Sequence, residues 1–88
     1  MRIPIEDAID LHAFSPRDVA SVVDEYLRAA QDAGFEVVRL IHGRGKGVQR
    51  ASVQRLLQTH EAVERYWDAA EAHLGATVVQ LKTRPPQG

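Results

Sequence analysis

The feature that most constrains the fold is an almost continuous apolar run, Phe35 to Ile41, that lies between Gly34 and a glycine-rich segment. Short runs of this kind, rich in β-branched residues and bounded by glycine, are typical of central strands in parallel sheets. Ile9–Leu11 is a second short apolar segment, and it fits the end of a buried strand. Between the two, apolar residues recur at three- and four-residue spacing. The sequence therefore predicts a strand, a helix over residues 16–33 and a parallel strand.

The predicted first helix has clear start and stop signals. Ser15 can cap it, Pro16 fits the first helical position, and Asp18 occupies the acidic site of a capping box. Gly34 ends the periodic pattern. These local signals alone predict where the helix begins and ends.

The second half of the chain is less decisive. A helix is predicted from about Val48, but the apolar spacing continues to Leu74 and permits either one long helix or a break near residue 60. Asp68 and Glu71 could start a second helix after such a break. Gly75–Leu81 is rich in β-branched residues and predicts a last strand. We expect a single domain over residues 1–82 and a flexible C-terminal tail over 83–88.

Composition removes several classes of protein. A chain of 88 residues can bury one core, which argues against a two-domain enzyme. Cysteine is absent, which excludes disulfide frameworks and thiolate zinc sites and suits a reducing compartment, so the cytoplasm is expected. No apolar run approaches 18 residues and acidic residues occur early, so no membrane or export segment is expected.

Positive charge is concentrated in the middle of the chain. Residues 36–59 carry five basic and one acidic side chain although the whole chain has a net charge of −1. A local excess of this kind favours contacts with a polyanion, although an ordinary solvated basic face is the simpler alternative. The candidates for such contacts are Arg39, Arg44, Lys46, Arg50 and Arg55.

The glycine-rich segment His42–Gly47 precedes the second predicted helix. Its spacing matches neither a P-loop nor a dinucleotide fingerprint. Backbone donors of such a loop, followed by a helix N-terminus, can nevertheless hold a phosphodiester, and a plain chain reversal is the alternative. Arg50 and Gln54 follow Lys46 at four-residue spacing and would extend the same surface. The predicted nucleic-acid contacts are therefore Gly43, Arg44, Gly45, Lys46, Gly47, Arg50 and Gln54.

Asp10, His12 and His42 form the candidate catalytic set. Alternation along a strand would put Asp10 and His12 on one side, and the carboxyl ends of parallel strands share an edge, so His42 should join them. A neutral histidine there could take a proton during phosphodiester hydrolysis while Asp10 orients it. The same three side chains could instead bind Mg²⁺ or another divalent metal. His60 and His73 are expected on the surface, and Trp67 in the core or at its rim.

Three short motifs together resemble the Smr (small MutS-related) domain, in its stand-alone bacterial form. They are Asp10-Leu11-His12, His42-Gly43-Arg44-Gly45 and Gly75-Ala76-Thr77-Val78-Val79. The resemblance covers residues 8–81 and implies an α/β two-layer sandwich of βαβαββ order, with a mixed four-stranded sheet and two helices. It also implies that 48–74 breaks into a helix and a short strand near Val63–Trp67. Ala13 and the acidic stretch 68–74 depart from the usual family pattern, and Asp68 could repel a phosphate backbone if it borders the groove.

The resemblance implies an endonuclease that nicks structured or branched DNA or cleaves RNA, with a role in DNA repair or recombination or in RNA quality control. It assigns catalysis to Asp10, His12 and His42. Because fold resemblance alone does not establish activity, two alternatives stand beside it. One is a nucleic-acid binding module without catalysis. The other is a protein-interaction domain for repair or ribosome-associated partners, for which an apolar patch at Tyr66 or Trp67 would be the sign.

Overall fold

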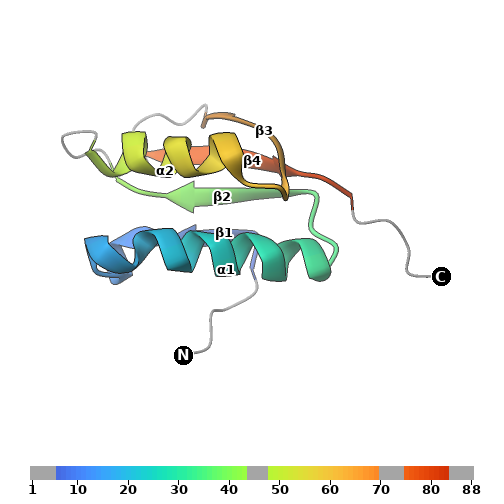
Figure 1. Ribbon diagram of the computed structural model, residues 1–88, viewed down its shortest axis with the longest axis horizontal. Coiled ribbons are helices and arrows are strands. Elements are labelled where there is room, and N and C mark those ends of the chain that lie inside the picture. The colour runs from blue at the N-terminus through green and yellow to red at the C-terminus, as the bar shows by residue number, and fades with distance from the viewer. Residues whose placement is uncertain (1–5, 44–47, 70–74, 84–88) are drawn as a thin grey trace.

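The computed structural model describes residues 6–43, 48–69 and 75–83 (Figure 1). In these ranges the chain forms four strands and two α-helices in the order strand, helix, strand, helix, strand, strand. The elements are β1 (Ala8–Asp10), α1 (Val19–Asp32), β2 (Val37–Ile41), α2 (Val48–Thr59), β3 (Val63–Asp68) and β4 (Ala76–Leu81). This order confirms the βαβαββ prediction. The predicted tail beyond Thr83 lies outside the described residues.

The four strands form one mixed sheet in the order β1-β2-β4-β3. β1 and β2 run parallel, with Asp10 paired to Ile41, so the predicted strand–helix–strand unit is confirmed. β4 lies antiparallel to both β2 and β3. The carboxyl ends of β1 and β2 therefore meet at one edge of the sheet, beside the start of β4.

Both helices cover the same face of the sheet (Figure 1). One core joins apolar side chains of α1 and α2 to inward-facing strand residues such as Ile9, Leu40 and Val79. Neither α1 nor α2 covers the opposite face, and Val37 and Arg39 of β2 are exposed there. The predicted central parallel strand is confirmed, since β2 lies between β1 and β4 and runs parallel to β1, but Val37 is exposed because the two helices cover one face of the sheet.

Residues 48–74, for which the apolar pattern permitted one long helix or a break, do break after α2. The backbone turns at residues 60–62, where Val63 N–H donates to the carbonyl of His60, and β3 follows. The short strand implied by the family resemblance is therefore confirmed. The suggestion that Asp68 starts a helix was wrong, since Asp68 is the last residue of β3. Glu71 lies outside the described residues.

Short turns at the two ends of α1 connect the helix to β1 and to β2. Gly34, at φ +89°, closes the helix with Phe35, whose N–H donates to the carbonyl of Ala30. At the other end a 3₁₀ turn, Pro16–Asp18, precedes the helix, and neither Ser15 nor Asp18 makes the predicted side-chain cap. Neither helix, as far as the structure describes it, is long and apolar enough to cross a membrane.

Candidate active site

Asp10 and His12 lie together where β1 ends. The chain leaves the strand at Asp10 and turns through a 3₁₀ segment, Leu11–Ala13. Oδ1 of Asp10 accepts the backbone N–H of His12 at 2.9 Å and lies 3.0 Å from Nδ1 of the same residue. The predicted proximity is confirmed, but its cause is a capped turn and not alternation along a strand, because His12 is no longer in the strand.

The contact between Asp10 and His12 fixes the chemistry of the imidazole. An ionised carboxylate only accepts hydrogen bonds, so Nδ1 carries the proton and Nε2 of the neutral ring keeps its lone pair. Both side chains are well exposed, at 59% for His12 and 60% for Asp10. A solvent-facing imidazole oriented by a carboxylate is the arrangement that a general base requires.

Gly43 forms the floor of this site. Its φ is +90°, and a β-carbon built on it would lie 2.2 Å from Nε2 of His12. The backbone N–H groups of His42 and Gly43 both donate to the carbonyl of Gly75, at 2.9 and 2.8 Å. The second and third sequence motifs are thus joined by hydrogen bonds, and they hold a residue without a side chain beneath the reactive nitrogen of the first.

His42 is brought to the same edge but is turned inward. Its exposed fraction is 4%. Nδ1 lies 3.0 Å from the carbonyl oxygen of Gly43, and Nε2 lies 2.9 Å from Oγ1 of Thr77. Because a carbonyl only accepts, Nδ1 carries the proton, and Nε2 accepts from the threonine hydroxyl. Both ring nitrogens are therefore occupied within the protein.

Thr77 is a site residue that reasoning from side-chain chemistry missed. It is fully buried on β4 and connects His42 to Gln54 of α2, whose Nε2 lies 3.3 Å from the same hydroxyl. Its position in the third motif was the available signal, because a polar residue within a β-branched strand needs a buried partner. That partner is His42.

Arg50 and Gln54 lie on one face of α2, as their spacing predicted, but they bond to Asp68 of β3. Nε of Arg50 donates to Oδ1 of Asp68 at 2.9 Å, and a second bond reaches Oδ2. Gln54 Nε2 also donates to Oδ1, at 2.9 Å. The bond from Arg50, then that from Gln54, lowers the pKa of the Asp68 carboxyl below its ordinary value. The expected repulsion of phosphate by Asp68 is thus offset within the protein.

The remaining predicted contacts, Arg44, Gly45, Lys46 and Gly47, lie outside the described residues. The alternative metal site can be tested against the side chains that are described. In residues 6–43, 48–69 and 75–83 no three histidine or carboxylate side chains come together as ligands. The orientation of His42 toward Thr77 explains this, since it removes the third ligand from Asp10 and His12. Asp10, His12 and His42 therefore do not form the common set of three ligands that the sequence suggested.

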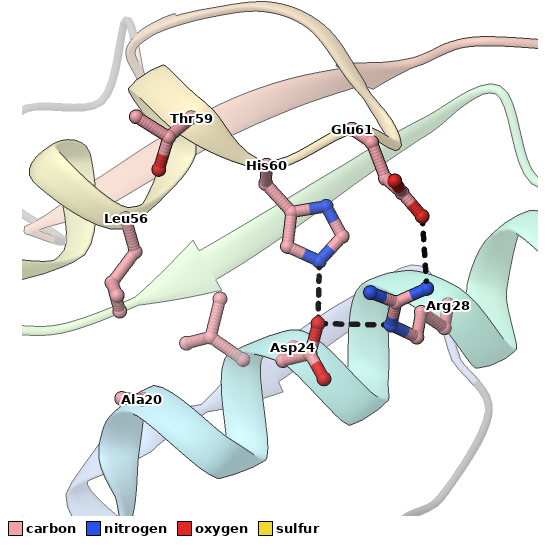
Figure 2. Close-up of a pocket in the computed structure, with 8 residues that line it drawn as sticks. Ala20, Asp24, Arg28, Leu56, Thr59, His60 and Glu61 are labelled. Carbon is pink, nitrogen blue, oxygen red and sulfur yellow. Dashed lines mark hydrogen bonds and ion pairs between the residues drawn. The ribbon is translucent and has the colours of Figure 1, made fainter.

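A second group of titratable residues lies away from this edge, between α1 and the end of α2. Figure 2 shows Nε2 of His60 directed at Oδ1 of Asp24, 2.8 Å away, and Arg28 between Asp24 and Glu61. Nδ1 of His60 accepts the N–H of Ala62 at 3.0 Å. The expectation of a surface position was wrong for His60, because its side chain is only 9% exposed and joins the two helices. His73 lies outside the described residues.

Comparisons with known proteins identify the family of this fold. The family model described as "Smr domain" matches residues 9–82. The chain is 42% identical over 76 residues to the Bacillus mycoides protein named Endonuclease MutS2, covering 84% of this chain and 10% of that protein. The chain thus spans about 10% of the length of the MutS2 proteins that it matches.

Two solved structures have the same fold. The Smr domain of Thermus thermophilus MutS2 superposes with a TM-score of 0.80 at 30% identity, covering 88% of this chain and 99% of that domain. YdaL, a stand-alone small MutS-related protein from Escherichia coli, also gives a TM-score of 0.80, at 25% identity over 91% of this chain and 67% of YdaL. The family match spans both strands that carry the candidate site and the strand that holds Thr77. The chain belongs to the Smr domain family.

Proposed function

We propose that the chain is an endonuclease that cleaves phosphodiester bonds in structured or branched DNA or in RNA. The observation that carries the proposal is the pair Asp10 and His12, which lies at an exposed edge of the sheet with Nε2 of His12 next to Gly43. The name endonuclease on the related MutS2 proteins is consistent with it. A role in DNA repair and recombination or in RNA quality control, in the cytoplasm, follows from the same proposal.

The proposed reaction uses His12 as the general base. Nε2 takes one proton from a water molecule as the water oxygen attacks phosphorus, and Asp10 stabilises the imidazolium that forms. A new P–O bond to the water oxygen forms and the P–O bond to the ester oxygen breaks. The leaving oxygen takes a proton from solvent, and His12 later returns its own proton to solvent. The atoms and charges balance without a cofactor.

His42 has a different role in this proposal from the one first predicted. Its two ring nitrogens bond to Gly43 and Thr77 and its side chain is buried, which favours a positioning residue that holds Gly43 beneath His12. Its role as a second acid or base stays a prediction. The N–H of Gly43 is already donated to Gly75, so Gly43 would contribute close approach to the scissile phosphate, and the predicted contacts Arg44, Gly45, Lys46 and Gly47 would bind it. Arg50 and Gln54 would join them on release of Asp68.

One observation favours a second candidate function, a nucleic-acid binding module without catalysis. Among the described residues at this edge, Nε2 of His12 is the one imidazole nitrogen that is not hydrogen-bonded within the protein, and the leaving oxygen has no donor of its own. Such a module would bind nucleic acid and leave cleavage to protein partners, such as repair or ribosome-associated factors. It predicts binding without turnover.

Cleavage assays separate these two functions. The purified chain is incubated with supercoiled plasmid, four-way-junction DNA and structured RNA, with magnesium and with chelator, beside His12→Ala and Asp10→Asn. We expect loss of cleavage in His12→Ala and a partial loss in Asp10→Asn, because the amide still occupies the space of the carboxylate. His60→Ala serves as a control histidine far from the edge. Binding without cleavage of any substrate would overturn the endonuclease in favour of the module.

A further inference from the structure

We propose that the helix-free face of the sheet is a platform for a single-stranded segment of nucleic acid, with a base stacked on Trp67 and the backbone held by Arg39 and Arg65. The inference rests on the proposed function and adds a substrate class to it. It concerns three residues on the face opposite α1 and α2, Arg39, Arg65 and Trp67, that the catalytic argument does not use.

Strand register assigns the residues of this platform to one face. Ala8, Arg39, Val78 and Trp67 form a row of directly paired residues across β1, β2, β4 and β3. Paired residues of neighbouring strands point to the same side of a sheet. The core beneath the helices contains their neighbours Ile9, Leu40 and Val79, so this row faces the other way. Val78 of this row also belongs to a small apolar cluster, separate from the main core, with Ala69 and Ala76.

The indole is the exposed aromatic surface of this row. Trp67 is 42% exposed although it is the largest apolar side chain in the sequence. The guanidinium of Arg65 lies 5.8 Å from the centre of its ring, and Nε of Arg65 donates to Gln80 at 2.7 Å. Because the guanidinium lies over one face of the indole, a base would stack on the other face, while Arg65 brings positive charge close to the phosphate of that nucleotide.

The amount of apolar surface argues against a protein partner on the same face. Val37 and Trp67 are the large hydrophobic residues that stand exposed in the described part of the chain. A stable protein interface buries roughly 800 Å² on each partner around an apolar centre. Two separated side chains beside two arginines match a polyanion with stackable bases better. Bases of an intact duplex are already stacked on one another, so the platform suits a single strand.

The platform and the candidate active site share this face. Asp10 pairs with Ile41, two residues after Arg39, so its carboxylate lies at the β1 edge of the face that carries Trp67. Three interstrand spacings, about 14 Å in total, separate β1 from β3. A strand with a rise of about 3.4 Å per nucleotide covers that distance in roughly four nucleotides. One single-stranded arm of a branched substrate can therefore span both sites.

Fluorescence tests the platform directly, because Trp67 is the single tryptophan of the chain. The wild-type protein is titrated with a 12-nucleotide oligo(dT) and with a blunt duplex of equal length, while anisotropy of a labelled oligonucleotide reports affinity independently. We expect the single strand to quench Trp67 and the duplex to leave it unchanged. Trp67→Ala should weaken single-strand binding about tenfold. Arg65→Ala should weaken it too, whereas Arg17→Ala, the same charge change in the exposed turn before α1, should have less effect.

Each outcome separates the platform from the endonuclease. Binding and cleavage without quenching, and without an effect of Trp67→Ala, would overturn the platform and leave the proposed function intact. Quenching without cleavage of any substrate would support the platform and overturn the endonuclease. A change in Trp67 emission on raising the protein concentration alone, with dimers in sedimentation and no response to oligonucleotide, would overturn the platform in favour of a second copy of the chain.

Discussion

Nε2 of His12 faces the α-carbon of Gly43 so closely that a β-carbon on Gly43 would lie 2.2 Å from it. This relationship explains why a histidine near the end of the first strand and a glycine after the second belong to one site. The two residues are 31 positions apart in the sequence, and the parallel pairing of β1 and β2 brings them together.

Gly43→Ala should therefore remove activity through displacement of the His12 ring. The substitution also forces a non-glycine residue to φ +90°, which costs on the order of 1–2 kcal/mol of stability. Gly34→Ala is a matched control, because Gly34 has φ +89° but a β-carbon added there would meet nothing within 4 Å. We expect urea unfolding to give similar losses for both variants and cleavage to be lost in Gly43→Ala alone. Full activity in Gly43→Ala would contradict the assigned site.

Thr77→Val tests whether His42 acts through its position. The isosteric change removes the hydroxyl that His42 and Gln54 share, leaving the buried Nε2 of His42 without its donor. An unsatisfied buried polar group costs about 1–3 kcal/mol, so unfolding should begin at lower urea concentration. Cleavage should fall as Gly43 loses its support. Thr59→Val, on the exposed end of α2, controls for loss of a threonine hydroxyl, and equal effects from both variants would remove His42 from the proposal.

Asp68→Asn should strengthen nucleic-acid binding. In the wild-type protein the guanidinium of Arg50 is bonded to both carboxylate oxygens of Asp68, so we expect Arg50→Ala alone to change affinity little. Removing the negative charge frees Arg50 for a phosphate. On duplex DNA each additional phosphate contact steepens the dependence of log affinity on log salt by about 0.9. Salt titrations of wild type, Asp68→Asn and the double variant with Arg50→Ala measure this, and an unchanged slope in Asp68→Asn would exclude Arg50 from the binding surface.

Local patterns predicted the first half of the fold well, because its signals are strong and short in range. Gly34 ends α1, and apolar periodicity identified both α1 and β2. Local patterns left the break after Thr59 open against one long helix, since the apolar spacing of α2 continues into β3 without glycine or proline. Tertiary pairing with β4 decides it, and only the family resemblance supplied that information.

The sequence predicted which residues lie at the candidate site, but it did not predict the directions of their side chains. The shared strand edge placed Asp10, His12 and His42 together from topology alone. The inward turn of His42 depends on Thr77, a residue 35 positions away whose hydroxyl is buried by the packing of α2 on β4. The pairing of Arg50 with Asp68 depends in the same way on the side-by-side position of α2 and β3. Contacts between residues so far apart in the sequence cannot be inferred from the spacing of apolar residues.

The contact between Asp24 and His60 predicts how stability changes in acid. The hydrogen bond from His60, reinforced by Arg28, lowers the pKa of the Asp24 carboxyl below its ordinary value of 3.8. Between the two values the unfolded chain binds more protons, so this contribution to stability is present above about pH 4 and is lost as the pH falls through the folded-state pKa. Asp24→Asn should thus be less stable than wild type at pH 7, and the two should converge toward pH 2. Urea midpoints at each pH measure the difference, with Glu25→Gln on the exposed side of α1 expected to follow wild type at neutral pH. A gap between Asp24→Asn and wild type that stays constant from pH 7 to pH 2 would show that the charge of Asp24 contributes nothing to the junction of α1 and α2.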